Sequence, residues 1–294
     1  MQLPNKWILL LPFVLAGCFR LDGFLFNPST DIEGYQFDDF TGEVEIVVGE
    51  RYRVETEDIY LFQTPSQNGN NIWGTYVGDT STIEEDTIIV YCHGNAGHMD
   101  YYWPRVKLLS HIRAPQHYGV LTFDYQGYGL SEGEPSEDNL YADLRTMLQW
   151  LQDRGATKDQ VVLYGFSLGS APASKVLLDF APDDGWLILE APFASADVFV
   201  QDATLLSTPA PFVVDLEIDV AEHVSKLQQP YLWLHGYDDD YIPLEGHGDL
   251  IFEQSASTYK HAALVRGANH SNVPQVMQYE VYLYLIEQFL RGQL

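Results

Sequence analysis

Residues 161–173 read Val-Val-Leu-Tyr-Gly-Phe-Ser-Leu-Gly-Ser-Ala-Pro-Ala, and they are the most informative segment for the fold. Its first four residues are an unbroken apolar run, typical of a buried strand, and its end opens a helix rich in Ala and Ser. The turn between them, 165–169, matches the pattern G-x-S-x-G. A serine on such a turn lies at the amino terminus of the helix, whose N–H groups and dipole favour a developing negative charge. Ser167 is therefore a candidate nucleophile, and the Leu168 N–H is a candidate donor to an oxyanion.

The same rhythm of apolar run and amphipathic stretch continues on both sides of this turn. The apolar runs lie at 88–92, 120–123, 161–164, 186–189, 231–234 and 262–265, and the helical patterns at about 100–113, 137–154, 168–180, 246–256 and 273–291. Continuous apolar strands flanked by helices indicate a parallel sheet that is covered on both faces. The sequence therefore predicts an α/β fold with a mostly parallel sheet.

Two regions depart from this rhythm. Residues 43–63 and 71–78 alternate apolar and polar positions, which predicts antiparallel strands at a sheet edge, joined by a turn at 68–71. Residues 191–229 connect two strands, contain several prolines, and predict a small, helix-rich cap inserted over the carboxyl edge of the sheet. Six apolar residues of this cap are candidates for lining an acyl site: Phe193, Phe199, Leu205, Leu206, Phe212 and Val213.

A second candidate loop, His93-Gly94-Asn95-Ala96-Gly97, follows the run at 88–92. A glycine-bearing turn at the end of a strand can direct a backbone N–H at a substrate oxygen. We expect that donor to be Asn95, with Ala96 as the alternative. His93 is expected to shape the loop rather than act as a base.

Two further loops supply an acid and a base. In His235-Gly236-Tyr237-Asp238-Asp239-Asp240, which follows the run at 231–234, the pattern H-G-x-x-D-x-x-I-P favours Asp239 over its two neighbours. His270 follows the run at 262–265, where a neutral imidazole can take a proton from Ser167 while Asp239 holds its other ring nitrogen. The acids close to His235 and His247 offer a metal site as an alternative, but their spacing lacks the regularity of hard-cation ligands. We expect no metal and no cofactor.

These motifs, together with residues 123–136 (Phe-Asp-Tyr-Gln-Gly-Tyr-Gly-Leu-Ser-Glu-Gly-Glu-Pro-Ser), resemble the α/β-hydrolase superfamily over residues 43–292. The resemblance is greatest to the branch of membrane-associated protein depalmitoylases and serine-aminopeptidase-like hydrolases. The order Ser167, Asp239, His270 is the one expected of that superfamily. The resemblance implies that Asp124 belongs to a structural loop and is not catalytic. Gln126 stands where the branch often has Arg, so a local ion pair is in question.

The expected activity is that of a serine hydrolase, which cleaves a carboxylic ester or thioester through an acyl-enzyme on Ser167. The expected substrate is a small acyl ester or an acylated molecule. One alternative is an exopeptidase or acyl-aminoacyl hydrolase that uses the same three residues. A second alternative, from another class, is a catalytically inactive binding protein anchored to the cell envelope.

Charge and the amino terminus bear on location. Acids outnumber Lys and Arg by 42 to 15, giving a net charge of −27, which excludes a nucleic-acid binder in practice. Residues 1–17 have the charge and apolar core of a signal peptide, and Leu15-Ala16-Gly17-Cys18 resembles a bacterial lipobox. We therefore expect Cys18 to carry lipid and to anchor the protein to a membrane of the bacterial envelope, the outer membrane if the host has one. Residues 18–42 would be a tether and N-terminal segment before the hydrolase domain at 43–294.

The second cysteine, Cys92, ends an apolar run and would have no disulfide partner if Cys18 is lipidated. It is expected to be a small buried hydrophobic residue.

Overall fold

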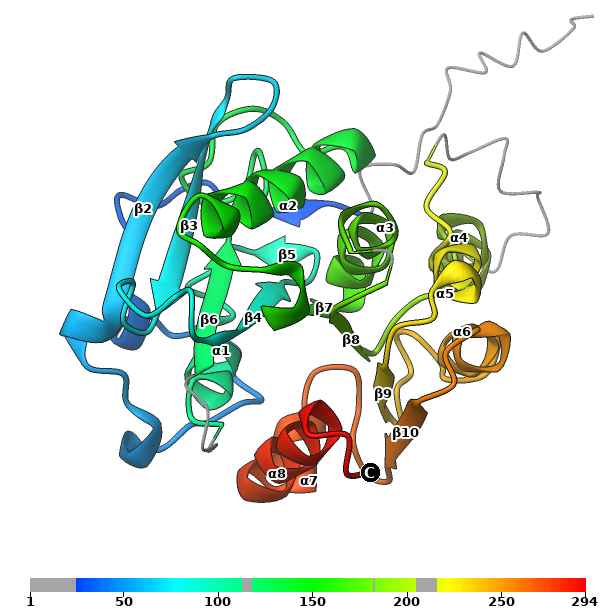
Figure 1. The fold of residues 1–294 in the computed structure, drawn as a ribbon. Helices are drawn as coiled ribbons and strands as arrows, with labels where there is room; N and C mark the ends of the chain where they lie inside the picture. The colour runs from blue at the N-terminus through cyan, green and yellow to red at the C-terminus, as the bar shows by residue number, and fades with distance from the viewer. Residues whose placement is uncertain (1–24, 113–117, 182, 205–215) are drawn as a thin grey trace, which may run out of the picture.

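The computed structural model describes residues 25–112, 118–181, 183–204 and 216–294, and Figure 1 shows their arrangement. An eight-stranded sheet forms the centre, in the order β10-β9-β8-β7-β4-β6-β3-β2. The six strands from β10 to β6 are parallel, and β3 and β2 add antiparallel at one edge. The strands are β2 (Ile59–Pro65), β3 (Asn71–Val77), β4 (Thr87–Cys92), β6 (Tyr118–Phe123), β7 (Val161–Phe166), β8 (Trp186–Glu190), β9 (Tyr231–Gly236) and β10 (Lys260–Val265). All six predicted parallel strands are confirmed.

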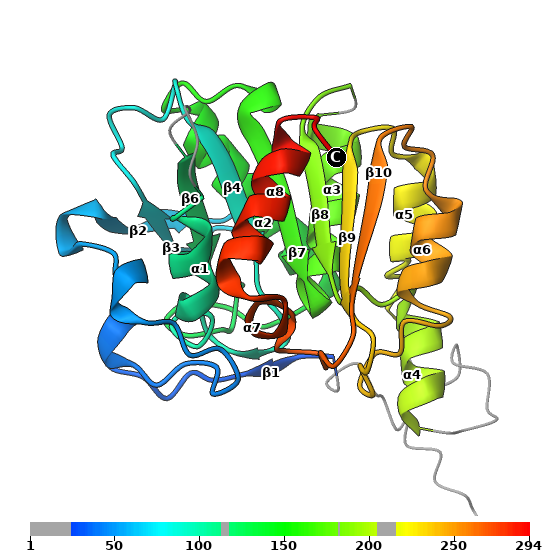
Figure 2. The ribbon, with the colours of Figure 1, turned by 90° about the horizontal axis from the view of Figure 1, so that it is seen from below.

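Helices cover both faces of the sheet, as the sequence predicts (Figures 1 and 2). One face packs against α2 (Glu137–Gln152), α3 (Ser170–Phe180), α5 (Val220–Lys226) and α6 (Gly248–Gln254), and the other against α1 (Trp103–Leu109), α7 (Val273–Met277) and α8 (Tyr279–Leu290). Helix α4 (Ala196–Thr204) lies near the carboxyl ends of the strands (Figure 2). Within residues 191–229, predicted to form the cap, α4 thus lies at that edge, whereas α5 packs on a face of the sheet. Its residues 205–215 lie outside the described residues.

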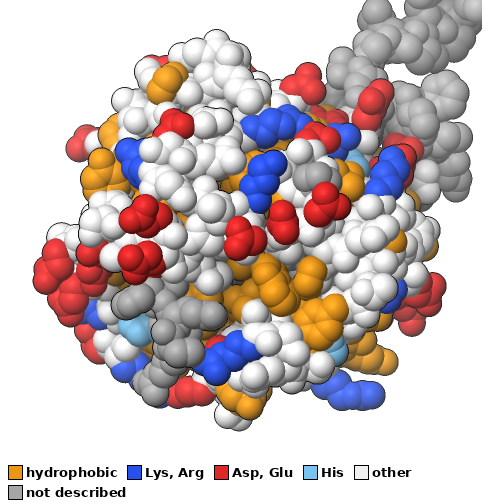
Figure 3. All heavy atoms as spheres, in the orientation of Figure 1, with side chains coloured by type: hydrophobic (Ala, Val, Ile, Leu, Met, Phe, Trp, Pro, Cys, Tyr) orange, Lys and Arg blue, Asp and Glu red, His pale blue; other side chains and the backbone are white. Residues whose placement is uncertain are grey.

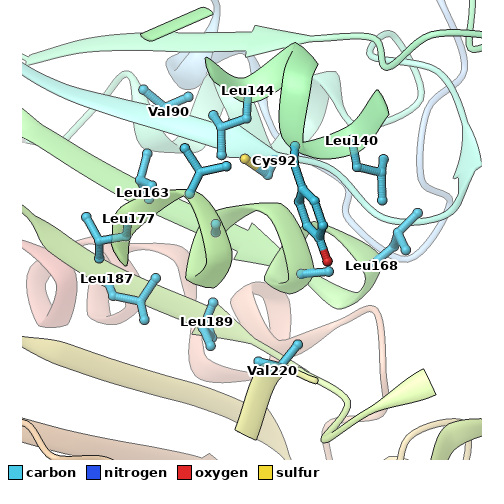
Figure 4. Close-up of a cluster of buried hydrophobic side chains, with 14 of the residues drawn as sticks. Val90, Cys92, Leu140, Leu144, Leu163, Leu168, Leu177, Leu187, Leu189 and Val220 are labelled. Atoms are coloured by element: carbon cyan, nitrogen blue, oxygen red, sulfur yellow. The ribbon is translucent and has the colours of Figure 1, made fainter. Parts of the chain in front are cut away.

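The core follows from the alternation of side chains along each buried strand. Val90 and Leu163 point to the α2–α3 face, whereas Tyr91 and Tyr164 point to the α1–α8 face. Cys92 belongs to the first cluster, fully buried among leucines in Figure 4, and burial raises the pKa of its thiol well above the usual range. It is a free thiol, so the prediction of a small buried hydrophobic residue is confirmed.

The antiparallel edge is only partly as predicted. Strands β2 and β3 form a hairpin around Asn68-Gly69-Asn70, with Gly69 at φ 90°. The alternating residues 43–58, however, form no strand and carry two short 3₁₀ helices, η3 (Glu50–Tyr52) and η4 (Thr56–Asp58). Ile46 is buried, but Val44 is 77% exposed. The strand prediction for 43–58 is therefore wrong.

Residues 25–58 instead form a strap, here called the N-terminal strap, which crosses the carboxyl edge of the sheet. It begins with β1 (Asn27–Pro28), which pairs in parallel with β5 (Ala96–Gly97) and runs beneath the strand ends in Figure 2. Further along is the 3₁₀ helix η2 (Phe37–Asp39). The strap ends near α8, where the Tyr279 hydroxyl donates to the Val47 carbonyl over 3.1 Å. From Leu25 onward it is therefore packed against the domain.

The surface carries the excess of acidic residues. Figure 3 shows Asp and Glu side chains over much of the face drawn in Figure 1, with fewer Lys and Arg between them. Among the described residues, no helix is long and apolar enough to cross a membrane.

Candidate active site

Ser167 lies on a strained turn where β7 ends and α3 is about to begin. Its φ is +51°, in the left-handed region that side chains other than glycine rarely adopt. Both flanking glycines are required by close contacts. A Cβ at Gly169 would come within 1.9 Å of the Cys92 carbonyl oxygen, and one at Gly165 within 2.5 Å of the Gly169 carbonyl oxygen. The G-x-S-x-G pattern thus specifies a tight crossing of β7, α3 and β4 with the serine at its tip.

The three predicted catalytic side chains meet at the carboxyl edge of the sheet. His270, which follows β10, has its Nε2 3.0 Å from the Ser167 Oγ. Its Nδ1 is 2.8 Å from the Oδ2 of Asp239, which follows β9. Because a carboxylate only accepts, Nδ1 carries the proton, and in the neutral ring Nε2 accepts from the serine hydroxyl. Ser167 is 5% exposed, so this candidate nucleophile lies below the surface.

Asp239 is held as a carboxylate by several donors. Its Oδ1 accepts from the backbone N–H groups of Tyr241 and Ile242, at 3.0 and 2.8 Å. Burial by itself would raise the pKa of this carboxyl. Hydrogen bonds from His235 and His270, the charge of His270 and the Ile242 N–H outweigh burial, so the pKa lies well below its ordinary value. The group that faces His270 Nδ1 is therefore ionised.

His235 is a buried support for this carboxylate and not a second base. Its Nδ1 accepts from the Trp233 indole N–H over 3.0 Å, which fixes the proton on Nε2. That Nε2 lies 2.9 Å from the Ile242 carbonyl oxygen and 3.2 Å from the Asp239 Oδ2. Both nitrogens are occupied, so the ring is locked in place.

The two neighbouring aspartates have other surroundings. Asp238 is exposed, and its Oδ2 accepts from the Gly267 N–H over 2.8 Å. Asp240 is also exposed. Within the described residues, neither forms a hydrogen bond with His270, so the choice of Asp239 among the three agrees with this geometry.

The loop after β4 contains the two N–H groups predicted as alternative donors to an oxyanion. The buried His93 donates from Nδ1 to the Gly94 carbonyl over 2.7 Å, which fixes the peptide that contains the Asn95 N–H. No acceptor for that N–H occurs among the described residues. The Ala96 N–H, the alternative donor, already bonds the Tyr102 hydroxyl at 3.3 Å. Of the two predicted donors, only the Asn95 N–H is thus without a partner among the described residues. The Leu168 N–H lies in the first turn beyond β7, where helical N–H groups lack intrahelical partners.

The N-terminal strap supports this loop from outside. The Asn95 carbonyl accepts from the Asn27 N–H at 2.9 Å and from the Tyr128 hydroxyl at 3.0 Å. Ser29 N–H bonds the Gly97 carbonyl over 2.9 Å. Strand pairing by residues far away in the sequence thus fixes the loop.

Part of the predicted cap borders the site. The Tyr241 ring lies 4.9 Å from that of His270 and 5.6 Å from that of Phe199 on α4. Phe193 and Phe199 are buried against one another, with ring centroids 5.8 Å apart. Leu205, Leu206, Phe212 and Val213, the other candidates for an acyl site, lie outside the described residues, as does Cys18.

The segment 123–136 has a structural role, as the resemblance implies. Asp124 is buried and accepts from the Met99 N–H and the Tyr35 hydroxyl, at 2.6 and 2.7 Å. Gln126 bonds the buried Asp143 through both its backbone N–H and its side-chain amide, at 2.8 and 2.7 Å. An amide thus replaces the ion pair.

A buried charged cluster under the site escapes sequence analysis. Arg105 of α1 bonds Glu43 of the strap and Glu190 at the end of β8, at 2.6 and 2.7 Å. Burial raises the pKa of Glu43, although the Arg105 charge opposes this effect. The sequence predicts an amphipathic helix at about 100–113. A single arginine in such a pattern is typical of a solvated face, so the sequence does not indicate that Arg105 is buried. No group of three potential metal ligands occurs in the described part of the chain.

The chain resembles known proteins of one fold class. A family model described as "alpha/beta hydrolase fold" matches residues 87–185, which include β4, β6, β7 and the Ser167 turn. The sheet order, the covering helices and this match establish the α/β-hydrolase fold, and the sequence-based prediction of the fold class is confirmed. The matches also support placement in the α/β-hydrolase superfamily.

Two kinds of similarity connect the chain to particular proteins, one in sequence and one in structure. The chain is 28% identical to the alpha/beta hydrolase domain-containing protein 17B of Homo sapiens over 244 residues, which cover 82% of this chain and 78% of that protein. It is 29% identical to protein 17C of Mus musculus over 210 residues, 70% of this chain and 60% of that protein. Among solved structures, the esterase Pf2001 of Pyrococcus furiosus has a TM-score of 0.68 at 17% identity and covers 91% of this chain and 97% of its own. Est1E of Butyrivibrio proteoclasticus, solved with ferulic acid bound, has a TM-score of 0.63 at 16% identity, with 79% and 98% covered.

Proposed function

We propose that this protein is a serine hydrolase that cleaves a carboxylic ester or thioester through an acyl-enzyme on Ser167. The observation that carries the proposal is the pair of aligned hydrogen bonds, 3.0 Å from Ser167 to His270 and 2.8 Å from His270 to Asp239. A hydroxyl, an imidazole and an ionised carboxylate in this order form an activated nucleophile. The esterases and hydrolase-domain proteins with which the chain shares its fold or sequence support the same reading.

Acylation begins with attack of the Ser167 Oγ on the carbonyl carbon while its proton passes to His270 Nε2. The carbonyl electron pair moves onto oxygen and gives a tetrahedral oxyanion. Asp239 stabilises the imidazolium through Nδ1 and keeps its carboxylate form, consistent with its low pKa. Collapse of the oxyanion breaks the bond to the alkoxide or thiolate, which takes the proton from Nε2. An acyl ester on Ser167 remains.

Deacylation repeats these steps with water as the nucleophile. Water loses a proton to His270 Nε2 as its oxygen bonds the acyl carbon, and collapse of the second intermediate expels the Ser167 Oγ, which regains the proton. The carboxylic acid leaves. In both halves, we assign the Asn95 and Leu168 N–H groups as donors to the oxyanion, where each donor contributes about 10²–10³-fold in rate.

An active-site probe tests the proposal. A fluorophosphonate should label the wild type on the peptide containing Ser167, and Ser167→Ala should abolish the labelling. Ser174→Ala, in the same helix α3 but bonded to His223, is the matched control and should be labelled like the wild type. Labelling that persists in folded Ser167→Ala would contradict the assignment of the nucleophile, and an unlabelled wild type would favour an inactive binding protein.

The choice of substrate needs a separate comparison. An ester, a thioester and an amide that share one acyl group should be compared. We expect the ester and the thioester to be turned over faster than the amide. Faster cleavage of the amide would favour the exopeptidase or acyl-aminoacyl alternative.

We further propose that lipid on Cys18 attaches the protein to a membrane of the bacterial envelope. Leu25, which follows Cys18 by seven residues, is already buried in the domain. Seven residues reach at most about 25 Å. The N-terminal strap then continues to β1, beside the Asn95 loop. This short connection supports a position of the catalytic edge of the sheet close to the membrane surface.

A further inference from the structure

Arg105 is the most deeply buried cation near the site, with an exposed fraction of 1%. Its guanidinium uses four N–H groups. Nε and Nη2 bond the two Glu43 oxygens at 2.6 and 3.1 Å, Nη1 bonds Glu190 at 2.7 Å, and Nη2 also bonds the Ser271 carbonyl at 2.6 Å. An arginine on the surface does not need four such hydrogen bonds, because water solvates its charge. Burying a charge is costly unless it is paired and fully bonded, so the cluster needs an explanation.

Two of its contacts lead directly to the catalytic side chains. The Ser271 carbonyl that it bonds belongs to the residue immediately after His270. The guanidinium also lies 3.9 Å from the ring centroid of Phe166, the residue immediately before Ser167. The Phe166 ring in turn lies 5.3 Å from the His270 ring. One side chain therefore touches the loop of the base and the strand of the nucleophile.

The two carboxylates come from segments that lie far apart in the sequence. Glu43 belongs to the N-terminal strap, 62 residues before Arg105. Glu190 ends β8 and accepts from the hydroxyls of Tyr164 and Tyr282. Glu190 is therefore committed to this cluster and does not reach His270. The carboxylates hold the guanidinium from two sides and leave Nη2 aimed at Ser271.

We propose that Arg105 is a positioning residue which, held by Glu43 and Glu190, fixes the His270 loop relative to Ser167. The inference rests on the proposed hydrolase function and deepens it. Lysine cannot replace this arrangement, because an ammonium has three N–H groups at one point and cannot serve four acceptor atoms placed around a planar fork. Misplacement of a catalytic group by about 1 Å can lower a rate about 100-fold.

The test measures how fast each active site reacts. Arg105→Lys keeps the charge and removes the fork, and Glu43→Gln loosens the guanidinium from the strap side. Arg145→Lys is the matched control, since Arg145 makes a partly exposed ion pair with Asp179 at 3.0 Å, away from the site. For each variant, we would measure the second-order rate of fluorophosphonate labelling at Ser167, the final labelled fraction, and kcat and KM for a soluble ester.

We expect Arg105→Lys to label at least 10-fold more slowly per active site, with a correspondingly lower kcat and a KM within about 2-fold of wild type. Glu43→Gln should show a smaller loss of the same kind, and Arg145→Lys none. If the labelled fraction falls but the remaining sites react at the wild-type rate, Arg105 only stabilises the fold and the proposal is overturned.

Folding failure and failure of the proposed function give different results. If Arg105→Lys does not fold, the per-site rate of Glu43→Gln decides. If the wild type is labelled at Ser167 and the folded variants are labelled equally fast, only the proposed role of Arg105 is overturned. Wild type that does not label at all overturns the hydrolase proposal and this inference with it.

Discussion

Two histidine loops lie at the carboxyl edge of the sheet, and each histidine is close to a carboxylate. His93, after β4, is fully buried. Its Nδ1 donates to Gly94, and its Nε2 lies 3.4 Å from Asp124 without a hydrogen bond. His270, after β10, has Asp239 on one nitrogen and Ser167 on the other.

The surroundings of the two rings show which partners a catalytic base needs. A carboxylate near an imidazole is not sufficient. One ring nitrogen must be held by an ionised acid while the other accepts from a nucleophile. His93 lacks the second partner and is enclosed by the rings of Tyr102, Tyr125 and Tyr128, so its role is to fix a backbone peptide.

Replacing the two histidines should separate these roles with the largest effects. His270→Ala should lower kcat by about 10⁴–10⁶-fold with little change in thermal stability. His93→Phe keeps a ring but loses the bond to Gly94, so it should lower kcat only about 10–100-fold, through a less ordered oxyanion donor. Steady-state kinetics and thermal unfolding of both variants measure this. Equal losses of kcat in two folded variants would remove the distinction.

A smaller effect should distinguish Asp239 from its neighbours. Asp239→Asn should lower kcat by about 10⁴-fold, because the wrong tautomer of His270 is then favoured. Asp238→Asn and Asp240→Asn, at exposed positions, should stay within about 3-fold of wild type. If either neighbour is the damaging one, the orienting acid has been assigned to the wrong residue.

The dependence of the free energy of unfolding on pH, in the acidic range, should reflect the ionisation of Asp239. The folded-state pKa of Asp239 lies below its ordinary value of 3.8, so the unfolded chain binds the proton more readily. Its stabilising contribution is then present above about pH 4 and is lost as the pH falls toward the folded pKa. Chemical unfolding at pH 6 and at pH 3 should show Asp239→Asn less stable than wild type at pH 6 and the difference reduced at pH 3. A difference that grows on acidification would contradict this sign.

The smallest effect on catalysis is expected at the anchor. The Asn95 loop is fixed by β1 and by Tyr128. Cys18→Ser should therefore leave kcat unchanged for a soluble ester while it moves the protein from the membrane fraction to the soluble fraction, or leaves an unprocessed precursor. Mass spectrometry of the native amino terminus should find lipid on Cys18. An unmodified Cys18 would refute the anchor.

Local sequence was sufficient for much of this molecule. Each parallel strand is an unbroken apolar run, and the turn at Ser167 has its own glycine pattern because of the close contacts of Gly165 and Gly169. His270 and Asp239 follow predicted strands whose carboxyl ends must meet at one edge. Such features depend on neighbours along the chain and on the parallel topology.

The features that sequence reasoning missed depend on partners that are distant in the chain. The alternation around Val44 and Ile46 resembles a strand, yet this segment pairs with neither edge strand of the sheet, and Ile46 is buried while Val44 is exposed. Arg105 has partners 62 and 85 residues away, and no periodic pattern reveals that a helical arginine will be covered. The placement of Asn27 against Asn95 is likewise a result of tertiary structure.

An acyl-enzyme on Ser167 can be detected by rapid-quench mass spectrometry during turnover of an activated ester. We expect a burst of the leaving group, a mass increase of one acyl group on the peptide containing Ser167, and loss of that adduct at the rate of steady-state turnover. Turnover without a covalent adduct, or with the acyl group on another residue, would contradict it.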